Sequence, residues 1–506
     1  MDMANTLHEL LGTGAADAPA IGAEGQADLT HGALRDFAAQ VVADLNGFGI
    51  GRNDRVAIVL PNGPEMATAF LTVACGATTA PLNPAYRADE FDFYLDDLNA
   101  RALIVMHDYD GDAVAAAEKR GVAVLRLTPR ADAAAGLFDL SGDAGSAPAA
   151  TGMAGAGDVA LVLHTSGTTS RPKIVPLSQA NVAASAAHIR TALNLTAADR
   201  CLNIMPLFHI HGLIAAVLSS VCAGASVWCS PGFNALRFFG WMEVARPNWY
   251  TAVPTMHQAI LSRAGRNSDL IAAQPLRLIR SSSSSLPPQV MAELEETFGC
   301  PVIESYGMTE AAHQMASNPL PPAARKPGSV GVAAGPEVAI MDVDGNILEQ
   351  GATGEIVIRG PNVTSGYEAN SKANAENFTN GWFRTGDQGV LDADGYLSIT
   401  GRLKEIINRG GEKISPREVD EILMEHEAVA QVVTFAMPHP KLGEEVAAAV
   451  VLREGATATD REIRDFAATR LADFKVPRKL LILDEIPKGA TGKLQRIGLA
   501  EKLGLA

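Results

Sequence analysis

The sequence has few cysteines and lacks any hydrophobic run long enough to cross a membrane. The cysteines are scattered and form no Cys-x-x-Cys pair: Cys75, Cys201, Cys222, Cys229 and Cys300. Their odd number and spacing argue against a disulfide framework or a zinc site and favour reduced thiols. The first residues lack the basic region and apolar core of a signal peptide, and the last residues form no peroxisomal address. We therefore expect a cytoplasmic protein without a membrane partner.

Positive charge is also scarce. The 41 lysine and arginine residues face 57 aspartate and glutamate residues, which gives a net charge of −16. This balance argues against nucleic acid as a partner, and a polyanionic small molecule would need cations placed locally. At 506 residues, with 47% hydrophobic and 19% charged residues, the chain is expected to form two or more domains with the composition of an ordinary globular enzyme.

The order of apolar and amphipathic segments predicts an α/β fold. Helices and strands are expected to alternate at residues 31–45, 55–60, 65–75, 79–82, 88–98 and 102–106. Such alternation is typical of parallel βαβ units. It continues from residue 178 to 320, with a helical pattern from Gln179, whereas residues 128–157, rich in alanine, glycine, aspartate and serine, are expected to form a surface loop.

Glycine-punctuated short strands predict a smaller β-rich subdomain at about residues 328–401. We place the domain boundary at Gly401-Arg402-Leu403-Lys404. Residues 1–401 would then form a large N-terminal domain of α/β sheets. Residues 402–506 would form a compact α+β domain of about a hundred residues, which is an ordinary domain size, with a first helix expected at residues 416–424.

A run of small hydroxyl residues around one glycine follows the apolar segment 159–163. It reads Thr165-Ser-Gly-Thr-Thr-Ser-Arg-Pro-Lys173. Backbone N–H groups and hydroxyls of such a loop can approach phosphate oxygens closely, and Lys173 adds a positive charge. The pattern is not the Walker motif, and a polar turn after a strand is the alternative interpretation. Alone, the loop predicts a phosphate but no particular reaction.

A second motif, Glu304-Ser-Tyr-Gly-Met-Thr-Glu310, stands at the end of the expected strand 302–306. Ligands of open α/β sheets bind at the carboxyl ends of strands. Tyr306 can stack on a flat base, Thr309 can donate to a phosphate, and Glu310 can bind Mg²⁺, which prefers oxygen ligands. A strand end followed by glycine is common, so this motif decides little by itself.

Two polar segments remain. Arg280-Ser-Ser-Ser-Ser-Ser285 follows the expected strand 276–280, and a flexible linker is improbable there because buried backbone must be hydrogen-bonded. Pro206-Leu-Phe-His-Ile-His211 has two histidines at metal-ligand spacing, but no third ligand with suitable spacing follows.

These blocks together resemble motifs of the adenylate-forming superfamily, which includes acyl-CoA synthetases, 4-coumarate–CoA ligases, luciferases and adenylation domains. The resemblance covers nearly the whole chain. It also includes Gly381-Trp-Phe-Arg-Thr-Gly-Asp387, Gly401-Arg402-x-Lys404, Asn408-Arg-Gly-Gly-Glu-Lys413 and Pro487-Lys-Gly-Ala-Thr-Gly-Lys493-Leu-Gln-Arg496. It implies ATP, Mg²⁺ and CoA, a monomer or homodimer, and a mobile C-terminal domain.

The resemblance implies roles for single residues. Lys493, Glu310, Lys173 and Thr165 would be catalytic, with Glu310 the metal ligand and Lys404 the hinge. The segment with Gly410, Gly411 and Lys413 would bind CoA, although a simple hairpin turn is an alternative for the glycines. ATP or AMP would be bound by Thr165, Ser166, Gly167, Thr168, Thr169, Lys173, Ser283, Ser284, Glu304, Tyr306, Thr309, Asp387 and Arg402, with Asp387 accepting from the ribose.

Within the superfamily, the sequence resembles the oxalyl-CoA synthetase group. The matching segments are His164 to Lys173, Pro206 to Gly212, Trp249 to Thr255, Ser317 to Pro321 and Asn408 to Pro416. The family usually has Ser-Gly-Ala-Ala-Pro-Leu where this chain has serines, so the acid pocket is expected to be polar. The acid would contact His209, His211, Ser281, Ser283 and His313, and His164 is an alternative source of this polarity.

Oxalate is a small dianion whose second carboxylate would be costly to bury unpaired, so a polar pocket suits it. Other acids remain open, among them malonate, a hydroxy acid, and a fatty or aryl acid. An adenylation enzyme that loads a carrier protein and a non-catalytic nucleotide-binding protein are further alternatives.

Overall fold

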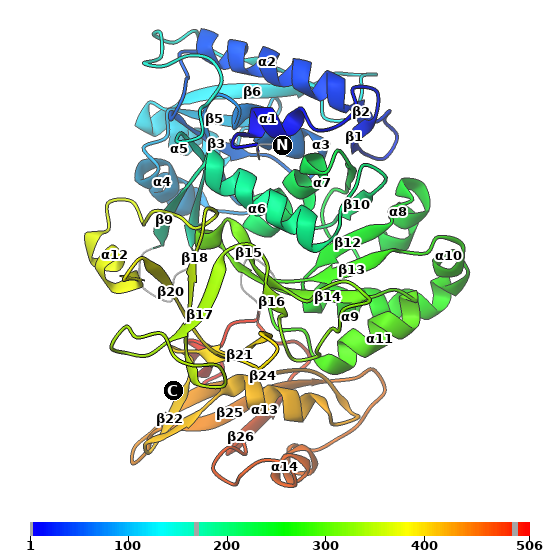
Figure 1. The fold of residues 1–506 in the computed structure, drawn as a ribbon, viewed down its shortest axis with the longest axis vertical. Helices are drawn as coiled ribbons and strands as arrows, with labels where there is room; N and C mark the ends of the chain where they lie inside the picture. Colours follow the sequence, from blue (N-terminus) through cyan, green and yellow to red (C-terminus); the bar gives the residue numbers. More distant parts are fainter. Residues whose placement is uncertain (1–3, 166–171, 488–493) are drawn as a thin grey trace.

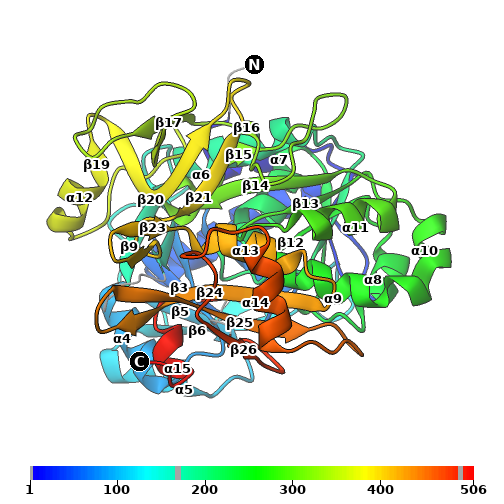
Figure 2. The ribbon, with the colours of Figure 1, turned by 90° about the horizontal axis from the view of Figure 1, so that it is seen from below.

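The computed structural model describes residues 4–165, 172–487 and 494–506. A larger N-terminal body lies above a smaller C-terminal one in Figure 1, and Figure 2 shows the smaller body from below. The expected site residues Ser166, Gly167, Thr168, Thr169 and Lys493 lie outside the described residues.

The first sheet contains β3 between two parallel neighbours, as expected for βαβ units. In spatial order its described strands are β7 (Phe138–Ser141), β6 (Ala123–Pro129), β5 (Ala102–Met106), β3 (Arg55–Val59), β4 (Thr78–Pro81), β8 (Val159–Thr165) and β9 (Lys173–Ser178). The central strands are continuous runs of buried β-branched and aliphatic residues, the pattern of strands covered on both faces.

A second, largely parallel sheet follows, and it carries most of the candidate site. In spatial order its described strands are β16 (Val332–Ala333), β15 (His313–Ser317), β14 (Val302–Met308), β13 (Leu278–Ser281), β12 (Trp249–Ala252), β10 (Arg200–Asn203), β11 (Ser226–Cys229), β1 (Pro19–Gly22) and β2 (Leu29–Thr30). The carboxyl ends of the parallel strands β12, β13 and β14 meet at one edge.

Helices pack on these two sheets. Those of the N-terminal body are α1 (Leu7–Leu11), α2 (His31–Gly47), α3 (Pro64–Val73), α4 (Ala88–Asp97), α5 (Asp112–Arg120), α6 (Gln179–Ala192), a π-helix (His211–Leu218), α7 (Ser219–Cys222), α8 (Phe238–Ala245), α9 (Pro254–Ala264), a 3₁₀-helix (Gly265–Asn267), α10 (Ser268–Ala273), α11 (Pro288–Phe298) and a 3₁₀-turn (Thr309–Ala311). The largest core joins side chains of both sheets with those of α2, α3 and α6. Helix α6 begins where Ser178 and Asn181 form a reciprocal cap.

The β-rich subdomain is an antiparallel sheet beside the second sheet. Its described elements are β17 (Glu337–Met341), β18 (Thr353–Arg359), α12 (Ser371–Asn377), β19 (Phe378–Thr379), β20 (Trp382–Leu391) and β21 (Leu397–Arg402). Strands β20 and β21 form a hairpin in which Asp387 pairs with Arg402.

The small C-terminal domain is an α+β unit with cores of its own. Its described elements are β22 (Ile407–Arg409), β23 (Glu412–Ile414), α13 (Pro416–Met424), β24 (Val429–His439), β25 (Gly443–Leu452), α14 (Asp460–Ala468), β26 (Lys479–Ile482) and α15 (Leu499–Lys502). Ser415 caps α13, and Pro416 occupies its first turn, where a missing N–H costs nothing.

Two features differ from the sequence-based expectations. The predicted loop 128–157 is wrong in part, because β6 extends to Pro129 and β7 pairs with it. A strand, β9, begins at the last residue of the predicted phosphate-binding segment Thr165–Lys173, called the phosphate loop below, and it pairs antiparallel with β8 before α6 begins. The start of α6 at Gln179 is as predicted.

Candidate active site

The described ends of the phosphate loop are Thr165 and Lys173, which pair across the ladder between β8 and β9. The Lys173 ammonium lies 4.3 Å from the centre of the Tyr367 ring, a cation–π distance. Burial lowers the pKa of Lys173, Glu310 opposes that shift, and the charge of Lys404 reinforces it. Lys404, the predicted hinge residue, therefore acts electrostatically on Lys173.

Glu310 lies in the 3₁₀-turn Thr309–Ala311, and its side chain is buried. The Tyr367 hydroxyl donates to Glu310 Oε1 at 2.7 Å. Burial raises the pKa of Glu310, while the Tyr367 hydrogen bond and the Lys173 charge work against that rise. Tyr367 thus joins Lys173 and Glu310. Sequence reasoning missed it, because Gly-Tyr-Glu stands in no recognised motif.

Asp387 accepts from two predicted nucleotide-binding residues. The Tyr306 hydroxyl donates to Asp387 Oδ2 at 2.5 Å, and Arg402 Nε donates to Oδ1 at 3.0 Å. The charge of Asp387 raises the pKa of Arg402, and burial raises the pKa of Tyr306. The fifteen-residue spacing of Asp387 and Arg402 is explained by the β20–β21 hairpin.

The serine run leaves the end of β13 as an anchored loop. Ser281 and Ser282 are fully buried, and the Ser282 hydroxyl donates to the backbone carbonyl of Ser305 at 3.0 Å. Glu304 Oε1 accepts from the Leu286 amide at 2.9 Å, and burial raises the pKa of Glu304 to about 7. Ser284 is exposed. The Glu304 carboxylate therefore anchors the end of this loop through the Leu286 amide.

The expected acid pocket is partly assembled. The imidazole Nδ1 of His211 lies 3.0 Å from Ser283 Oγ, and its Nε2 lies 2.6 Å from Thr251 Oγ1. The His313 ring meets the His211 ring edge to face at 5.0 Å. Ser283 has φ +71°, a strained conformation for a residue other than glycine and one that is common at functional sites.

Two other histidines have separate contacts. His209 Nδ1 accepts from the His211 amide at 3.3 Å. His164 Nε2 lies 3.0 Å from the Asp97 carboxylate, and its ring packs on Tyr94. Burial lowers the pKa of His164, although Asp97 opposes this. His164 therefore belongs to the contacts of α4.

The predicted CoA-binding segment forms a hairpin, which agrees with the alternative interpretation of its two glycines as a simple hairpin turn. Strands β22 and β23 pair Asn408 with Lys413, and Gly410 and Gly411 occupy the turn with φ of +60° and +102°. Lys413 is exposed.

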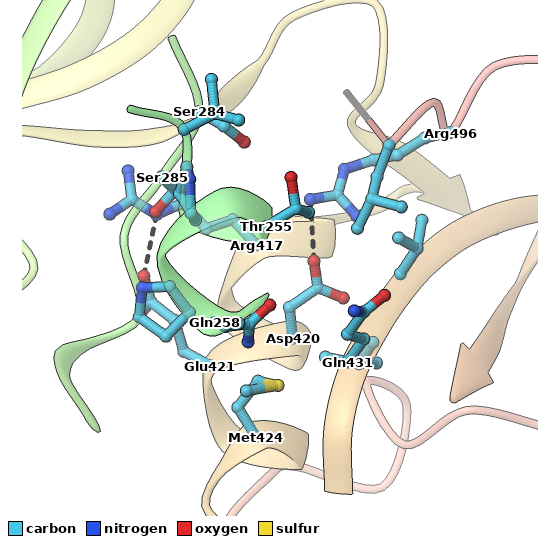
Figure 3. A pocket seen from close by; sticks show the side chains of 16 residues that line it. Thr255, Gln258, Ser284, Ser285, Arg417, Asp420, Glu421, Met424, Gln431 and Arg496 are labelled. Carbon is cyan, nitrogen blue, oxygen red and sulfur yellow. Dashed lines mark hydrogen bonds and ion pairs between the residues drawn. The ribbon is translucent and has the colours of Figure 1, made fainter. Parts of the chain in front are cut away.

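A cavity lies between the two bodies (Figure 3). Helix α9 and the serine loop form one wall, and α13 and β24 form the other. Leu494 and Arg496 complete the lining, and Arg496 is paired with Asp420 at 2.7 Å. Gln258 Nε2 of α9 donates to the Ala430 carbonyl of β24 at 3.0 Å. Leu494 and Arg496 thus line the same cavity as Ser284 and Ser285 of the serine loop.

Within the described ranges, no three His, Cys, Asp or Glu side chains gather as a metal site. No described helix combines the length and apolar character that a membrane span needs.

Residues 12–368 match the family model of AMP-binding enzymes, and residues 418–493 match that of the AMP-binding enzyme C-terminal domain. The chain belongs to the AMP-binding enzyme family. The predicted adenylate-forming resemblance is therefore confirmed, as is the fold of a large N-terminal and a small C-terminal domain.

Curated relatives of this AMP-binding enzyme are CoA ligases. A probable CoA ligase, CCL9, of Humulus lupulus is 46% identical, covering 99% of this chain and 97% of the relative. Oxalate–CoA ligases of Arabidopsis thaliana and Saccharomyces cerevisiae are 46% and 42% identical, covering 95% and 89% of this chain and 94% and 87% of the relatives. A sulfoacetate–CoA ligase of Cupriavidus necator is 36% identical, covering 93% of this chain and 92% of the relative. The AMP-binding enzyme is an AMP-forming acyl-CoA synthetase.

Crystal structures of MatB from Rhodopseudomonas palustris share the fold at 29% identity, covering 99% of both chains. The TM-score is 0.88 for the ATP-bound form and 0.79 for the apo form. The arrangement of this AMP-binding enzyme is thus more similar to the ATP-bound one.

Proposed function

We propose that the protein is an oxalate–CoA ligase that converts oxalate, CoA and ATP into oxalyl-CoA, AMP and pyrophosphate. The observation that carries this proposal is the cluster of polar side chains formed by His211, Ser283 and His313, in which Ser283 follows the carboxyl end of β13. Donors placed there suit a substrate whose second carboxylate must be neutralised when buried. The oxalate–CoA ligase relatives support the same substrate.

In the first step, an oxalate oxygen attacks the α-phosphorus of ATP, and pyrophosphate leaves with the electrons of the broken P–O bond. Lys173 and Thr165 would contact the phosphates, and Lys493 would stabilise the negative charge that develops on the transferring group. Asp387 would accept from the ribose hydroxyls, with Arg402 and Tyr306 holding its carboxylate. Thr309, Ser284 and Glu304 are proposed to complete the nucleotide site.

Glu310 fits a Mg²⁺ ion, because its buried carboxylate is held in place by the Tyr367 hydroxyl. One carboxylate is a typical protein contribution to a Mg²⁺ site whose other ligands are phosphate oxygens and water. The ion would supply charge neutralisation at those phosphates.

In the second step, the CoA thiolate attacks the acyl carbon, and AMP leaves with the electrons of the broken C–O bond. We propose that the C-terminal domain rotates about Lys404, so that Lys493 departs and the Gly410–Gly411 turn arrives beside CoA. The higher similarity to an ATP-bound structure, and the lining of the interdomain cavity by Leu494, support an adenylate-forming arrangement before that rotation.

Initial rates of pyrophosphate release over a panel of acids test the substrate. The panel contains oxalate, malonate, sulfoacetate, acetate, octanoate and 4-coumarate, each with and without CoA. We expect the highest kcat/KM with oxalate. Preference for octanoate or 4-coumarate would contradict the proposal and keep only the enzyme class.

Another small dianion is the second candidate, and the sulfoacetate–CoA ligase relative is the observation that favours it. Preference for sulfoacetate or malonate in the same panel would select it.

The expected cytoplasmic location and the monomeric or homodimeric state remain predictions; the five free, buried cysteines are compatible with a reducing compartment.

A further inference from the structure

A fully buried arginine, Arg280, lies on β13 next to His211 of the expected acid site. Among the described residues, no carboxylate lies within ion-pair distance of its guanidinium, and its Nε has no hydrogen-bond partner. Its remaining contacts are with Gln314, Thr251 and His211: Nη2 donates to Gln314 Oε1 at 3.1 Å, and Nη1 lies 3.4 Å from both Thr251 Oγ1 and His211 Nε2.

An isolated buried cation is costly and is rare without a partner anion. Burial lowers the pKa of Arg280 to about 9, so the group still carries its charge at neutral pH. The protein therefore maintains a positive charge that no described side chain neutralises. Such a charge is expected where an anionic substrate binds.

The contacts of Arg280 also fix the direction of the hydrogen bonds that lead to the pocket. Arginine has donors only. Because Arg280 Nη1 also donates to His211 Nε2, that nitrogen is an acceptor, and the Thr251 hydroxyl donates to it at 2.6 Å. Nδ1 of His211 then carries the hydrogen and donates to Ser283 Oγ at 3.0 Å. The Ser283 hydroxyl hydrogen is thereby available for a substrate oxygen.

We propose that Arg280 is the positioning residue that makes this pocket select acids with a second negative charge. Its charge attracts the distal carboxylate, and its hydrogen-bond relay orients the Ser283 hydroxyl toward that carboxylate as a donor. The inference rests on the proposed function. It adds to that function a residue, Arg280, that accounts for selectivity by charge.

Oxamate is the decisive probe, because it has the heavy-atom shape of oxalate but only one negative charge. Arg280→Met removes the charge and keeps a long side chain, and Arg280→Lys keeps the charge with fewer donors. We expect Arg280→Met to lower the oxalate-to-oxamate ratio of kcat/KM at least tenfold, mainly through the KM for oxalate. The KM for ATP stays within twofold, and Arg280→Lys gives an intermediate ratio.

Thermal unfolding separates this role from a structural one. Removal of an uncompensated buried charge leaves Tm unchanged or raises it. Oxalate with AMP raises the Tm of the wild-type protein, and that shift is lost in Arg280→Met. A lowered Tm together with an unchanged oxalate-to-oxamate ratio would overturn the inference.

Thr251→Val provides a second route if the Arg280 variants do not fold. It removes the hydroxyl that links Arg280 to His211, leaving only their direct contact at 3.4 Å, and should lower the oxalate-to-oxamate ratio of kcat/KM; an unchanged ratio overturns the inference. Rates of the wild-type enzyme are measured first. If it prefers malonate or sulfoacetate, the proposed function fails. The role of Arg280 is then tested by the ratio of kcat/KM for that dianion to kcat/KM for acetate. That ratio falls in Arg280→Met if the inference holds, and it is unchanged if the inference fails.

Discussion

Asp387 is the residue on which the proposed ribose contact depends. Its buried carboxylate already accepts from Tyr306 and Arg402, so it is held in one orientation. We predict that Asp387→Asn raises the KM for ATP by about 10- to 100-fold, the effect of losing a charged hydrogen-bond acceptor of about 1.5–3 kcal/mol. Steady-state rates at saturating acid measure it. Asp394→Asn, which removes an exposed carboxylate of the same subdomain, should leave the KM for ATP unchanged. Equal effects of the two variants would argue against the ribose role.

Glu304 makes stability depend on pH. Burial raises its pKa from 4.5 to about 7, so the folded state holds the proton more tightly than the unfolded state. Its contribution to stability is fully present below pH 4.5 and is lost as the pH rises through 7. Glu304→Gln keeps the acceptor for the Leu286 amide and removes that loss.

We therefore predict that the free energy of unfolding of Glu304→Gln rises relative to wild type between pH 5 and pH 8, by at most about 3 kcal/mol. Urea denaturation at both pH values measures the difference. Glu337→Gln is the control, because Arg359 lowers the pKa of that exposed carboxyl and no such rise is expected. If the free energy of unfolding of Glu304→Gln instead fell relative to wild type between pH 5 and pH 8, the raised pKa of Glu304 would be contradicted.

At the scale of elements, the β22–β23 hairpin carries the proposed CoA step. Gly411 has φ +102° and open space around its Cβ position, so Gly411→Ala introduces backbone strain of about 1 kcal/mol without a clash. We predict slower CoA-dependent AMP formation, because the turn would fit CoA less well, with an unchanged rate of acid-dependent ATP–pyrophosphate exchange.

Gly455→Ala is the matched control, since Gly455 lies in the same domain with φ +77° and equally open space. It should cost similar stability and leave both rates unchanged. If Gly455→Ala slowed AMP formation as much as Gly411→Ala, strain of the domain and not contact with CoA would explain the result.

The elements near the site differ in how well the sequence predicts them. Helix α13 is predicted at its observed bounds because Ser415, Pro416 and an amphipathic pattern mark it locally. Strand β9 was missed, because its pairing partner β8 is what makes residues 173–178 a strand. The Asp387–Arg402 pair follows from motifs, whereas Tyr367 and Thr251 join the site only through folding and carry no local signal.

For the whole molecule, the relation between the two domains matters most. The hydrogen bond from Gln258 of α9 to the Ala430 carbonyl crosses from one domain to the other. We predict that Gln258→Ala slows acid-dependent ATP–pyrophosphate exchange by up to about fivefold, because loss of about 1 kcal/mol shifts the domains away from this arrangement.

Gln274→Ala is its control, because the Gln274 amide donates to the Glu243 carbonyl within the N-terminal domain. The exchange rate of this variant should equal that of wild type. A slower exchange rate in Gln274→Ala, or an unchanged exchange rate in Gln258→Ala, would show that exchange does not depend on the interdomain hydrogen bond.

The most direct test of the central claim is mass analysis of the products formed from ¹³C-labelled oxalate, ATP and CoA. The account predicts labelled oxalyl-CoA and AMP in equal amounts, and neither product when oxalate is omitted. Absence of a labelled thioester, or formation of ADP in place of AMP, would contradict it.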